Sequence, residues 1–454
     1  MTQHIPRLMI AAPSSGVGKT TVTCALLAAL SSRGARVRAF KGGPDYIDPM
    51  FHREVVGVPS SNLDPFLLGE NTCRRLLAEH GSHAELAVIE SAMGYYDGVA
   101  QTDMASGYAL ARATGTPVVL VVDARGASLS LAAVVSGLAT FRRDAGIRGV
   151  ILNFASEALH ALVAPAIERE TGIPVLGYLP GMPDCALGSR HLGLVTADEV
   201  DGLRAIIGRL AARIEQTVDL RAISAIAGSA GDIEYAPDGV SRNFDGIPIA
   251  VARDKAFCFV YQDALDLLER MGARLMPFSP LADKALPTGA RGLYLPGGYP
   301  ELYAARLSAN RLMLRSVHAA LSRGLPCIAE CGGFLYLHDT LEDARGEPHA
   351  MVGFLRARAY RTQRLQRFGY ATLTARRETL LLREGESAPA HSFHYWDSET
   401  PGDALLASKP LRDVSWPCGV CTETLFAGFP HLHLCADPRM AARFLSRCEE
   451  ASPC

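Results

Sequence analysis

The sequence predicts an α/β protein of two domains, each built around a mainly parallel sheet. In the first half of the chain, short apolar segments alternate with helical segments, and the apolar ones cover residues 7–12, 35–40, 86–91, 117–124, 148–154 and 173–180. Apolar strands joined through helices favour right-handed βαβ units and a parallel sheet covered on both faces. The alternation restarts near residue 247, and 454 residues suffice for two or three domains.

The helical segments and the linker are read from periodicity and composition. In "TTVTCALLAALSSRG" (20–34), Val22, Leu26 and Ala29 fall on one helical face, and Gly34 supplies a stop. Residues 223–246 are small, polar and rich in turn formers, which predicts a linker. The expected domains therefore cover residues 1–222 and 247–445.

The second domain repeats the α/β pattern and then changes character. We expect strands at 247–254, 273–280, 291–298 and 325–330, a helix at 261–272, and a long helix before the last of these strands. Beyond about residue 351 the pattern becomes β-rich. No internal repeat interrupts this order.

Composition excludes several functional classes. Lys+Arg total 45 and Asp+Glu 47, a net charge of −2, which argues against nucleic acid or an anionic membrane as partner. The 11 cysteines include a single CxxC, at 418–421, with no second one to pair with it, and they indicate reduced thiols. The longest apolar strand-like run, 116–124, is far shorter than the ~20 residues of a membrane helix, and the N-terminus lacks a secretory signal. We therefore expect a cytoplasmic protein.

The first functional motif is "AAPSSGVGKTT", directly behind the first predicted strand. A Gly-rich loop that ends in Lys-Thr and opens a helix is typical of phosphate binding, because its N–H groups surround the phosphates of ATP. Pro13 replaces the usual first glycine, but the amides nearest the phosphates follow it. The alternative is a glycine-rich turn into an ordinary helix. The expected nucleotide-binding residues are Ser15, Gly16, Val17, Gly18, Lys19, Thr20 and Thr21, with the Thr20 hydroxyl as a Mg²⁺ ligand.

Carboxylates follow the second and third predicted strands. Asp45 and Asp48 lie in "FKGGPDYIDPMFH", and Glu90 and Asp97 in "VIESAMGYYDG". Ligands bind at the carboxyl ends of strands in open parallel sheets, and Mg²⁺ prefers such hard oxygen ligands. Together with Thr20, these acids predict a metal–phosphate site. For Asp48 alone, which precedes a proline, the alternative is a turn cap.

The second motif is "LPCIAECGGFLYL", in which a buried strand runs into Cys331 and two glycines. This pattern predicts a sharp turn that presents the thiol at a helix N-terminus, where thiolate is favoured. Gly297 and Gly298 of "LPGGYPE" are candidate oxyanion donors, and "FPHLHL" supplies His431 and His433 as candidate bases. The alternative is a buried structural cysteine.

Strand–Cys–Gly–Gly with a late histidine resembles the class I glutamine amidotransferases, which release ammonia from glutamine through a thioester. In that family a glutamate follows the catalytic histidine by two positions, and here His433 stands there. The resemblance thus implies Cys331 and His431 as the catalytic pair. It also predicts a less well-oriented imidazole and slow glutamine hydrolysis.

An ATP site and a glutaminase in one chain suggest amidation of a carboxylate. The motifs "FKGGPDYIDP", "VIESAMGYYDG", "SRHLGL", "IAVARDKAFCFVY", "LYLPGGYPELY", "ECGGFLYL" and "RLQRFGY", in this order, resemble the cobyrinate a,c-diamide synthase family over about residues 6–434. The resemblance implies an N-terminal domain similar to dethiobiotin synthetase, which phosphorylates two acetate side chains of a corrin in cobalamin biosynthesis. A C-terminal class I glutamine amidotransferase domain would supply ammonia to each acyl phosphate.

The resemblance also implies roles for single residues. It implies a metal shell of Thr20, Asp45 and Glu90, and it puts Lys41, Asp48 and Asp97 near the substrate carboxylate or acyl phosphate. Asn153, at the end of a predicted strand, becomes a candidate for adenine contact. Residues 189–194 either shape the substrate site or domain interface, or are structural.

Some features leave the substrate open. Ser91, Ala92 and residues 390–392 depart from the usual motifs, so hydrogenobyrinate, sirohaem-type rings and nickel-sirohydrochlorin are alternative macrocycles. The basic run 356–367 is either a solvated β face or a partner for a polycarboxylate ring. The expected partners are a tetrapyrrole polycarboxylate and glutamine, without nucleic acid or membrane. Ring metal, order of amidation, ammonia route and oligomeric state stay open, a homodimer being one option.

Two rival classes remain. One is an ATP-switched partitioning or assembly protein, but such proteins carry a second lysine early in the loop, where this chain has Pro13 and Ser14, and they lack the Cys–Gly–Gly elbow. The other is a simple amidase without ligase activity.

Overall fold

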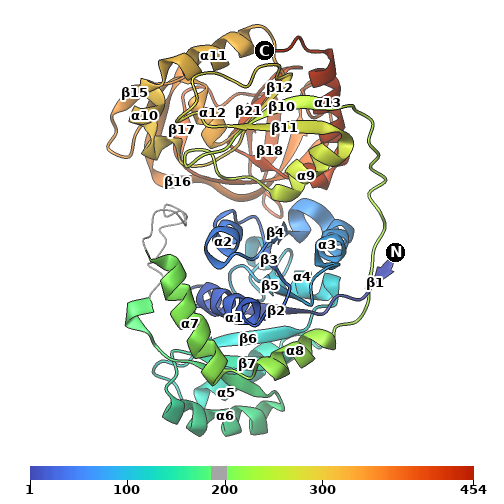
Figure 1. The fold of residues 1–454 in the computed structure, drawn as a ribbon, viewed down its shortest axis with the longest axis vertical. Coiled ribbons are helices and arrows are strands. Elements are labelled where there is room, and N and C mark those ends of the chain that lie inside the picture. The colour runs from blue at the N-terminus through green and yellow to red at the C-terminus, as the bar shows by residue number, and fades with distance from the viewer. Residues whose placement is uncertain (186–201) are drawn as a thin grey trace. The chain divides into compact units, whose positions relative to one another are not determined.

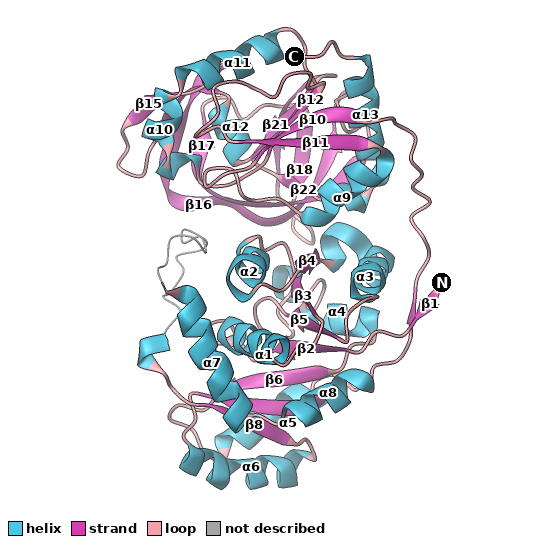
Figure 2. Ribbon diagram, in the orientation of Figure 1, coloured by secondary structure: helices cyan, strands magenta, loops and turns pink. Residues whose placement is uncertain are grey.

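The computed structural model describes residues 1–185 and 202–454 (Figure 1). The described chain forms two compact units, Met1–Pro237 and Asp238–Cys454. The predicted site segment 189–194 lies outside the described residues. Figure 2 shows that helices and strands alternate along the first unit, whereas strands dominate the later part of the second. The α/β class expected from the sequence is confirmed.

A seven-stranded parallel sheet forms the centre of the first unit, in the order β4-β3-β5-β2-β6-β7-β8. Its strands are β2 (Arg7–Ala11), β3 (Val37–Gly42), β4 (Ser60–Leu63), β5 (Leu86–Glu90), β6 (Val118–Asp123), β7 (Ile147–Asn153) and β8 (Val175–Leu179). The strand order reverses direction near the central β2, and open parallel sheets bind ligands beyond the carboxyl ends at such a reversal. The phosphate loop leaves the sheet at this point.

Helices cover both faces of this sheet. They are α1 (Lys19–Ser32), α2 (Ile47–Phe51), α3 (Pro65–Gly81), α4 (Gly107–Thr114), α5 (Ser130–Thr140), α6 (Glu157–Thr171), α7 (Leu203–Thr217) and α8 (Leu220–Gly228), with short helical turns η1 (His52–Val56), η2 (Val99–Gln101) and η3 (Pro183–Cys185). One hydrophobic core joins α1, α7 and α8 to one face of the strands. Gly34, the predicted helix stop, has a left-handed backbone (φ 84°) just past the end of α1.

The edge strand β4 has no counterpart among the predicted strands. Its sequence, Ser-Ser-Asn-Leu, is polar although all four residues are buried. Asn62 explains part of this, since its amide donates to the carbonyls of Gly43 and Asp45 and thereby ties the strand to the loop after β3. A polar strand with tertiary partners gives no apolar alternation to read.

The region expected to be a linker is partly ordered into elements. Residues 223–228 complete α8, in which Leu220, Ile223 and Ala227 are buried. Further on, β9 (Ile233–Glu234) pairs with β1 (Thr2–Gln3). The structure divides at Pro237, inside the predicted linker range. The limits of the functional domains stay predictions.

The second unit contains a six-stranded sheet in the order β11-β10-β12-β13-β21-β20. Its strands are β10 (Ile247–Ala252), β11 (Ala273–Phe278), β12 (Gly292–Leu295), β13 (Cys327–Glu330), β20 (Val420–Cys421) and β21 (Leu425–Gly428), parallel except for β20. A second sheet contains β14 (His338–Glu342), β15 (Pro348–Ala350), β16 (Leu355–Ala375), β17 (Ser387–Ser398), β18 (Leu405–Ser408), β19 (Ser415–Cys418) and β22 (His431–Leu432). The expected change to β structure is confirmed.

The helices of the second unit are α9 (Gln262–Met271), α10 (Ala304–Ala309), α11 (Arg311–Ser322), α12 (Gly332–Tyr336) and α13 (Pro438–Glu450), with turns η5 (Pro300–Leu302) and η6 (Leu434–Ala436). The single long helix expected before β13 is wrong. It breaks at Asn310, whose side-chain amide instead donates to the carbonyls of Pro280 and Asp283.

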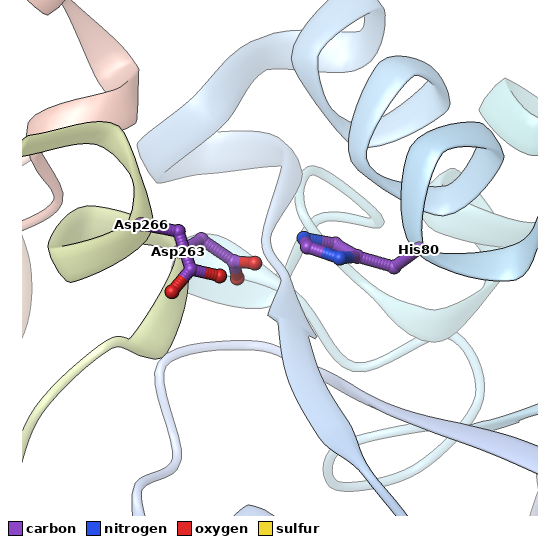
Figure 3. A group of neighbouring side chains, drawn as sticks. All are labelled: His80, Asp263 and Asp266. Carbon is purple, nitrogen blue, oxygen red and sulfur yellow. The ribbon is translucent and has the colours of Figure 1, made fainter. Parts of the chain in front are cut away.

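Helix α9 carries acidic side chains, among them Asp263 and Asp266. Asp263 and Asp266 project from α9, while His80 lies at the end of α3 in the first unit (Figure 3). Within α9, the Gln262 amide donates to Asp266 at 2.8 Å.

No helix in the described parts of the chain combines the length and apolarity that crossing a membrane requires.

Candidate nucleotide and glutaminase sites

The phosphate loop has the backbone that its glycines require. Gly16 (φ 82°) and Gly18 (φ 90°) are left-handed, and α1 begins immediately afterwards at Lys19. A Cβ on Gly18 would lie 2.1 Å from Nδ2 of Asn153, so no larger residue fits there. The loop therefore ends at a helix N-terminus with its amides available, which is the geometry that suits an anion.

Asn153, at the end of β7, holds this loop from behind. Its Nδ2 donates to the Val17 carbonyl at 2.8 Å, and its Oδ1 accepts from the Phe154 amide at 3.0 Å. Both polar atoms of the side chain are thus engaged with backbone. The structure gives Asn153 a part in shaping the loop, and the adenine contact expected from the resemblance stays a prediction.

Lys19 is buried at the base of the loop. Its ammonium donates to the Ser14 carbonyl at 3.0 Å and to the Met93 carbonyl. Burial, and next the positive charge of Lys41, lower the pKa of Lys19 to about 8. A cation destabilised in this way gains most from an incoming polyanion, because the anion supplies the missing countercharge.

Glu90 is the centre of a buried polar cluster at the ends of β3 and β5. Its Oε1 accepts from the Thr20 hydroxyl at 2.6 Å and from the Lys41 ammonium at 2.9 Å, and its Oε2 lies 3.3 Å from Nε2 of His52. Lys41 also contacts Asp48, with Nζ and Oδ2 2.7 Å apart. The structure therefore brings together Thr20, Glu90, Lys41 and Asp48.

The cluster perturbs the pKa values of its members in opposite directions. Burial by itself would raise the pKa of Glu90, but Lys41, His52 and the Thr20 hydroxyl together outweigh burial and hold this pKa well below its usual range. Burial likewise acts to lower the pKa of Lys41, yet Asp48 and Glu90 overcome it and raise the net value. Both groups are therefore charged at neutral pH, although each is almost fully buried.

The other two predicted acids make local contacts with backbone. Asp45 Oδ1 accepts from the Ile47 amide at 2.7 Å and from the Asp48 amide at 3.3 Å, in the turn that begins α2. Burial, and next the charge of Asp48, raise the pKa of Asp45 to about 6. Asp97 Oδ2 accepts from the Gly94 amide at 3.0 Å.

His52 belongs to the cluster although the sequence reasoning missed it. It is fully buried in η1, with Nδ1 3.1 Å from the Ser60 hydroxyl and Nε2 facing Glu90. It is the last residue of the quoted stretch "FKGGPDYIDPMFH", but nothing in that pattern marks the histidine as a partner of a carboxylate. Its contact with Glu90 joins η1 to the end of β5, two elements far apart in the sequence.

The second site is built on the turn between β13 and α12. Cys331 has a left-handed φ of 46° with ψ of −98°, and its amide donates to the Gly428 carbonyl at 2.7 Å. A Cβ on Gly333 would lie 2.0 Å from the Leu295 carbonyl oxygen, and one on Gly332 would lie 3.0 Å from the Gly298 nitrogen. The predicted sharp turn at the cysteine is confirmed, and both following glycines are needed for close backbone approach.

His431 and the Gly297–Gly298 loop line this turn. A Cβ on Gly297 would lie 2.5 Å from Cε1 of His431, so the glycine backbone packs directly on the imidazole. Burial by itself lowers the pKa of His431, but contacts with Cys331 and Glu330 outweigh it and raise the pKa to about 10. The structure thus brings together Cys331, His431, Gly297 and Gly298 as a thiol–imidazole pair beside backbone amides.

His433, the other candidate base, lies in a different environment. Its ring stacks on Tyr261 at 4.5 Å between centroids with an interplanar angle of 18°, and its Nδ1 accepts from the Cys435 amide. The carboxylate that lies beside His431 is instead that of Glu330, which the sequence reasoning missed. Its Oε2 lies 3.7 Å from Nδ1 of His431.

The basic run 356–367 lies on β16, and three of its five arginines form ion pairs with acids of the same unit. Arg356 pairs with Asp339, Arg358 with Glu399, and Arg367 with Asp397. The buried and exposed positions alternate at the start of the strand. This alternation is typical of a solvated β face, and the interpretation of the run as a partner for a polycarboxylate ring stays a prediction.

Comparison with known proteins matches a family model to each half of the chain. Residues 8–194 match the model of the CobQ/CobB/MinD/ParA nucleotide binding domain, and residues 248–438 match that of the CobB/CobQ-like glutamine amidotransferase domain. Cobyrinate a,c-diamide synthase of Caldanaerobacter subterraneus subsp. tengcongensis is 39% identical over 443 residues, covering 97% of this chain and 98% of the relative.

Further relatives are similar over the same length. Cobyrinate a,c-diamide synthase of Salmonella typhimurium is 42% identical over 450 residues, covering 96% of this chain and 97% of the relative. Hydrogenobyrinate a,c-diamide synthase of Thermobifida fusca is 41% identical over 473 residues, covering 99% and 98%. With similarity at this level from end to end, and with a phosphate loop in one unit and a cysteine elbow in the other, the chain belongs to the family of cobyrinate and hydrogenobyrinate a,c-diamide synthases.

Proposed function

We propose that this protein converts the a and c acetate carboxylates of a corrin, or of a closely related tetrapyrrole, into carboxamides at the expense of ATP and glutamine. The observation that carries the proposal is that one chain, similar to a,c-diamide synthases over their whole length, contains both the buried Lys19–Glu90–Lys41 arrangement and the Cys331–His431 pair. The Cys331–His431 pair argues against a purely ATP-switched partitioning protein. The Lys19–Glu90–Lys41 arrangement argues against a simple amidase.

The first step activates the carboxylate, which is a poor electrophile. An acetate oxygen attacks the γ-phosphorus of ATP, the bond to the β–γ bridging oxygen breaks, and ADP leaves with that electron pair. The loop amides of residues 15–18 and the Lys19 ammonium hold the phosphates, with Thr21 continuing the first turn of α1. Lys41 and Asp48, with Asp97 nearby, serve the acetate and the acyl phosphate.

A divalent cation fits the donor set in this unit. The Thr20 hydroxyl and the Glu90 carboxylate meet at 2.6 Å, and both are the hard oxygen ligands that Mg²⁺ prefers. We propose Thr20, Glu90 and Asp45 as the residues that hold it. When bound, Mg²⁺ would neutralise charge on the transferring phosphoryl group. Lys41 supplies positive charge to the carboxylates of Glu90 and Asp48.

The glutaminase step produces ammonia. The Cys331 sulfur attacks the side-chain amide carbon of glutamine, His431 gives its proton to the departing nitrogen, and ammonia leaves from a thioester. Water then attacks the thioester and gives one proton to His431. The C–S bond breaks, which restores the Cys331 thiolate beside the imidazolium, and glutamate leaves after losing its second proton to solvent. The amides of Gly297 and Gly298 are the proposed donors to the oxyanion that forms in both halves.

Ammonia completes the reaction at the acyl phosphate. Its nitrogen attacks the acyl carbon, the C–O bond to phosphate breaks, and the nitrogen loses one proton to give the amide and inorganic phosphate. Repetition at the second acetate gives the diamide. Cobyrinate and hydrogenobyrinate are the first candidates for the ring, since relatives of equal similarity are named for each.

The experiment offers cobyrinate, hydrogenobyrinate and sirohydrochlorin separately, with ATP, magnesium and glutamine, and identifies the products by mass spectrometry. We expect a diamide from one of the first two rings, with ADP, phosphate and glutamate formed in step. Glutamate formation without ADP would support a simple amidase. ATP turnover without any amide on any ring would refute the proposed function.

A further inference from the structure

The buried carboxylate of Glu330 stands one residue before the proposed nucleophile. It ends β13 opposite Gly428 of β21, and only 2% of the residue is exposed. Burying a carboxylate charge without hydrogen-bond or ionic partners would cost free energy, so the contacts of Glu330 indicate its role. Those contacts come from both neighbouring elements of the glutaminase site.

Its two oxygens are held from different sides. Oε1 accepts from the Leu432 amide at 3.1 Å, and Oε2 accepts from the Tyr294 hydroxyl at 3.3 Å. Because Leu432 directly follows His431, the first contact holds the backbone that carries the imidazole. The second oxygen faces that imidazole, 3.7 Å from Nδ1.

The position that normally supplies the third catalytic group is occupied otherwise. His433 follows His431 by two residues, but its ring stacks on Tyr261 and its Nδ1 receives the Cys435 amide. An imidazole in that position supplies no negative charge for His431, unlike the usual glutamate. The carboxylate on the Nδ1 side of His431 comes from the preceding strand.

We propose that Glu330 is the positioning carboxylate of the glutaminase, which orients His431 and stabilises its protonated form beside the Cys331 thiolate. With Nδ1 facing the carboxylate, Nε2 is left for the thiol and the leaving ammonia. This inference rests on the proposed glutaminase role of Cys331 and His431. The sequence led us to expect a less well-oriented imidazole and slow glutamine hydrolysis, and this proposal predicts the opposite.

If the Glu330 carboxylate stabilises the imidazolium of His431, its removal should change the ionisation of the Cys331 thiol in a specific way. Without Glu330 the imidazolium is less stable, so the proton returns to sulfur and the thiolate fraction at neutral pH falls. At high pH the thiol ionises without help from the imidazole, and the difference should vanish. A variant that merely disturbed the structure would alter the reactivity at all pH values.

The test is Glu330→Gln in the full-length protein, with iodoacetamide as the probe and mass spectrometry of the Cys331 peptide as the readout. We expect the alkylation rate at pH 7 to fall about tenfold, to converge with the wild-type rate above about pH 10, and kcat for glutamine hydrolysis to fall at least as much. Ammonia-dependent synthesis should persist. Glu386→Gln is the matched control, because Glu386 binds Arg443 away from the thiol, and it should leave the profile unchanged.

Different results separate the two proposals. An alkylation profile for folded Glu330→Gln that overlays the wild-type profile would overturn the role of Glu330, while glutamine hydrolysis by the wild type would still support the glutaminase. Absence of hydrolysis in the wild type would instead refute the proposed function. If Glu330→Gln does not fold, Glu330→Asp carries the test, since withdrawing the charge by one methylene should also lower the neutral rate, and an unchanged rate contradicts the proposal.

Discussion

Lys41 is the residue on which the buried cluster of the first unit depends, and its removal should be measurable. Its ammonium lies 2.7 Å from Asp48 and 2.9 Å from Glu90, and these side chains are at most 10% exposed. Lys41→Met keeps the length of the apolar stem but leaves both carboxylates without their countercharge. Breaking a buried ion pair by removing one partner costs about 3–5 kcal/mol.

That cost is a large part of the stability of a domain. A shift of about 2–4 °C per kcal/mol applies to units of this size, so the melting temperature of the first unit should fall by roughly 6–20 °C. The loss should shrink as the pH falls from 8 to 5. In the variant, Lys41 no longer opposes the effect of burial on Glu90, so the pKa of Glu90 rises, the carboxylate takes up a proton more readily as the pH falls, and the cost of its uncompensated charge shrinks.

The two tryptophans make the assay specific for one unit. Trp396 and Trp416 both lie in the second unit, so their fluorescence follows that unit alone, whereas far-ultraviolet circular dichroism follows both. Lys41→Met should lower a dichroism transition and leave the fluorescence transition in place. Glu90→Gln added to Lys41→Met should restore about 1–3 kcal/mol, although Glu90→Gln alone should destabilise the wild type. The reasoning fails if Lys41→Met melts like the wild type, or if Glu90→Gln destabilises both backgrounds equally.

Other predictions concern catalysis, the loop and pH. Cys331→Ala should abolish glutamine-dependent amidation but retain amidation with ammonium chloride; loss of both in folded protein would contradict separate sites. Lys19→Ala should stop ATP-dependent synthesis and leave glutamine hydrolysis, as assayed by ADP and glutamate release. Gly18→Ala should reduce ATP affinity at least about tenfold, because its Cβ would lie 2.1 Å from Asn153; unchanged affinity by calorimetry would be the contrary result. Burial raises the pKa of Glu301 to about 7, so the folded second unit retains a proton that the unfolded chain releases. Its stability should fall as pH rises from 5 to 8, and Glu301→Gln should flatten this slope in tryptophan-monitored unfolding.

Local sequence determined both reactive turns of this protein. The phosphate loop and the cysteine elbow are each encoded by contiguous residues, in which a buried strand, glycines with special backbone requirements and a helix start follow one another. Gly18 and Cys331 have the left-handed backbone that these patterns predict. Such features depend on interactions within a few residues, so they could be predicted from the sequence without a structure.

The tertiary structure alone decided which charged groups meet. Lys41 and Glu90 are 49 positions apart, Asn153 and Val17 are 136 apart, and Glu330 and Leu432 are 102 apart. Their contacts arise because parallel strands place distant strand ends at one edge of a sheet, an order set by packing of the whole sheet. No local pattern distinguishes Glu330 from any other acid at the end of a strand, and the pairing of β13 with β21, which sets Glu330 opposite Gly428, brings His431 beside that carboxylate.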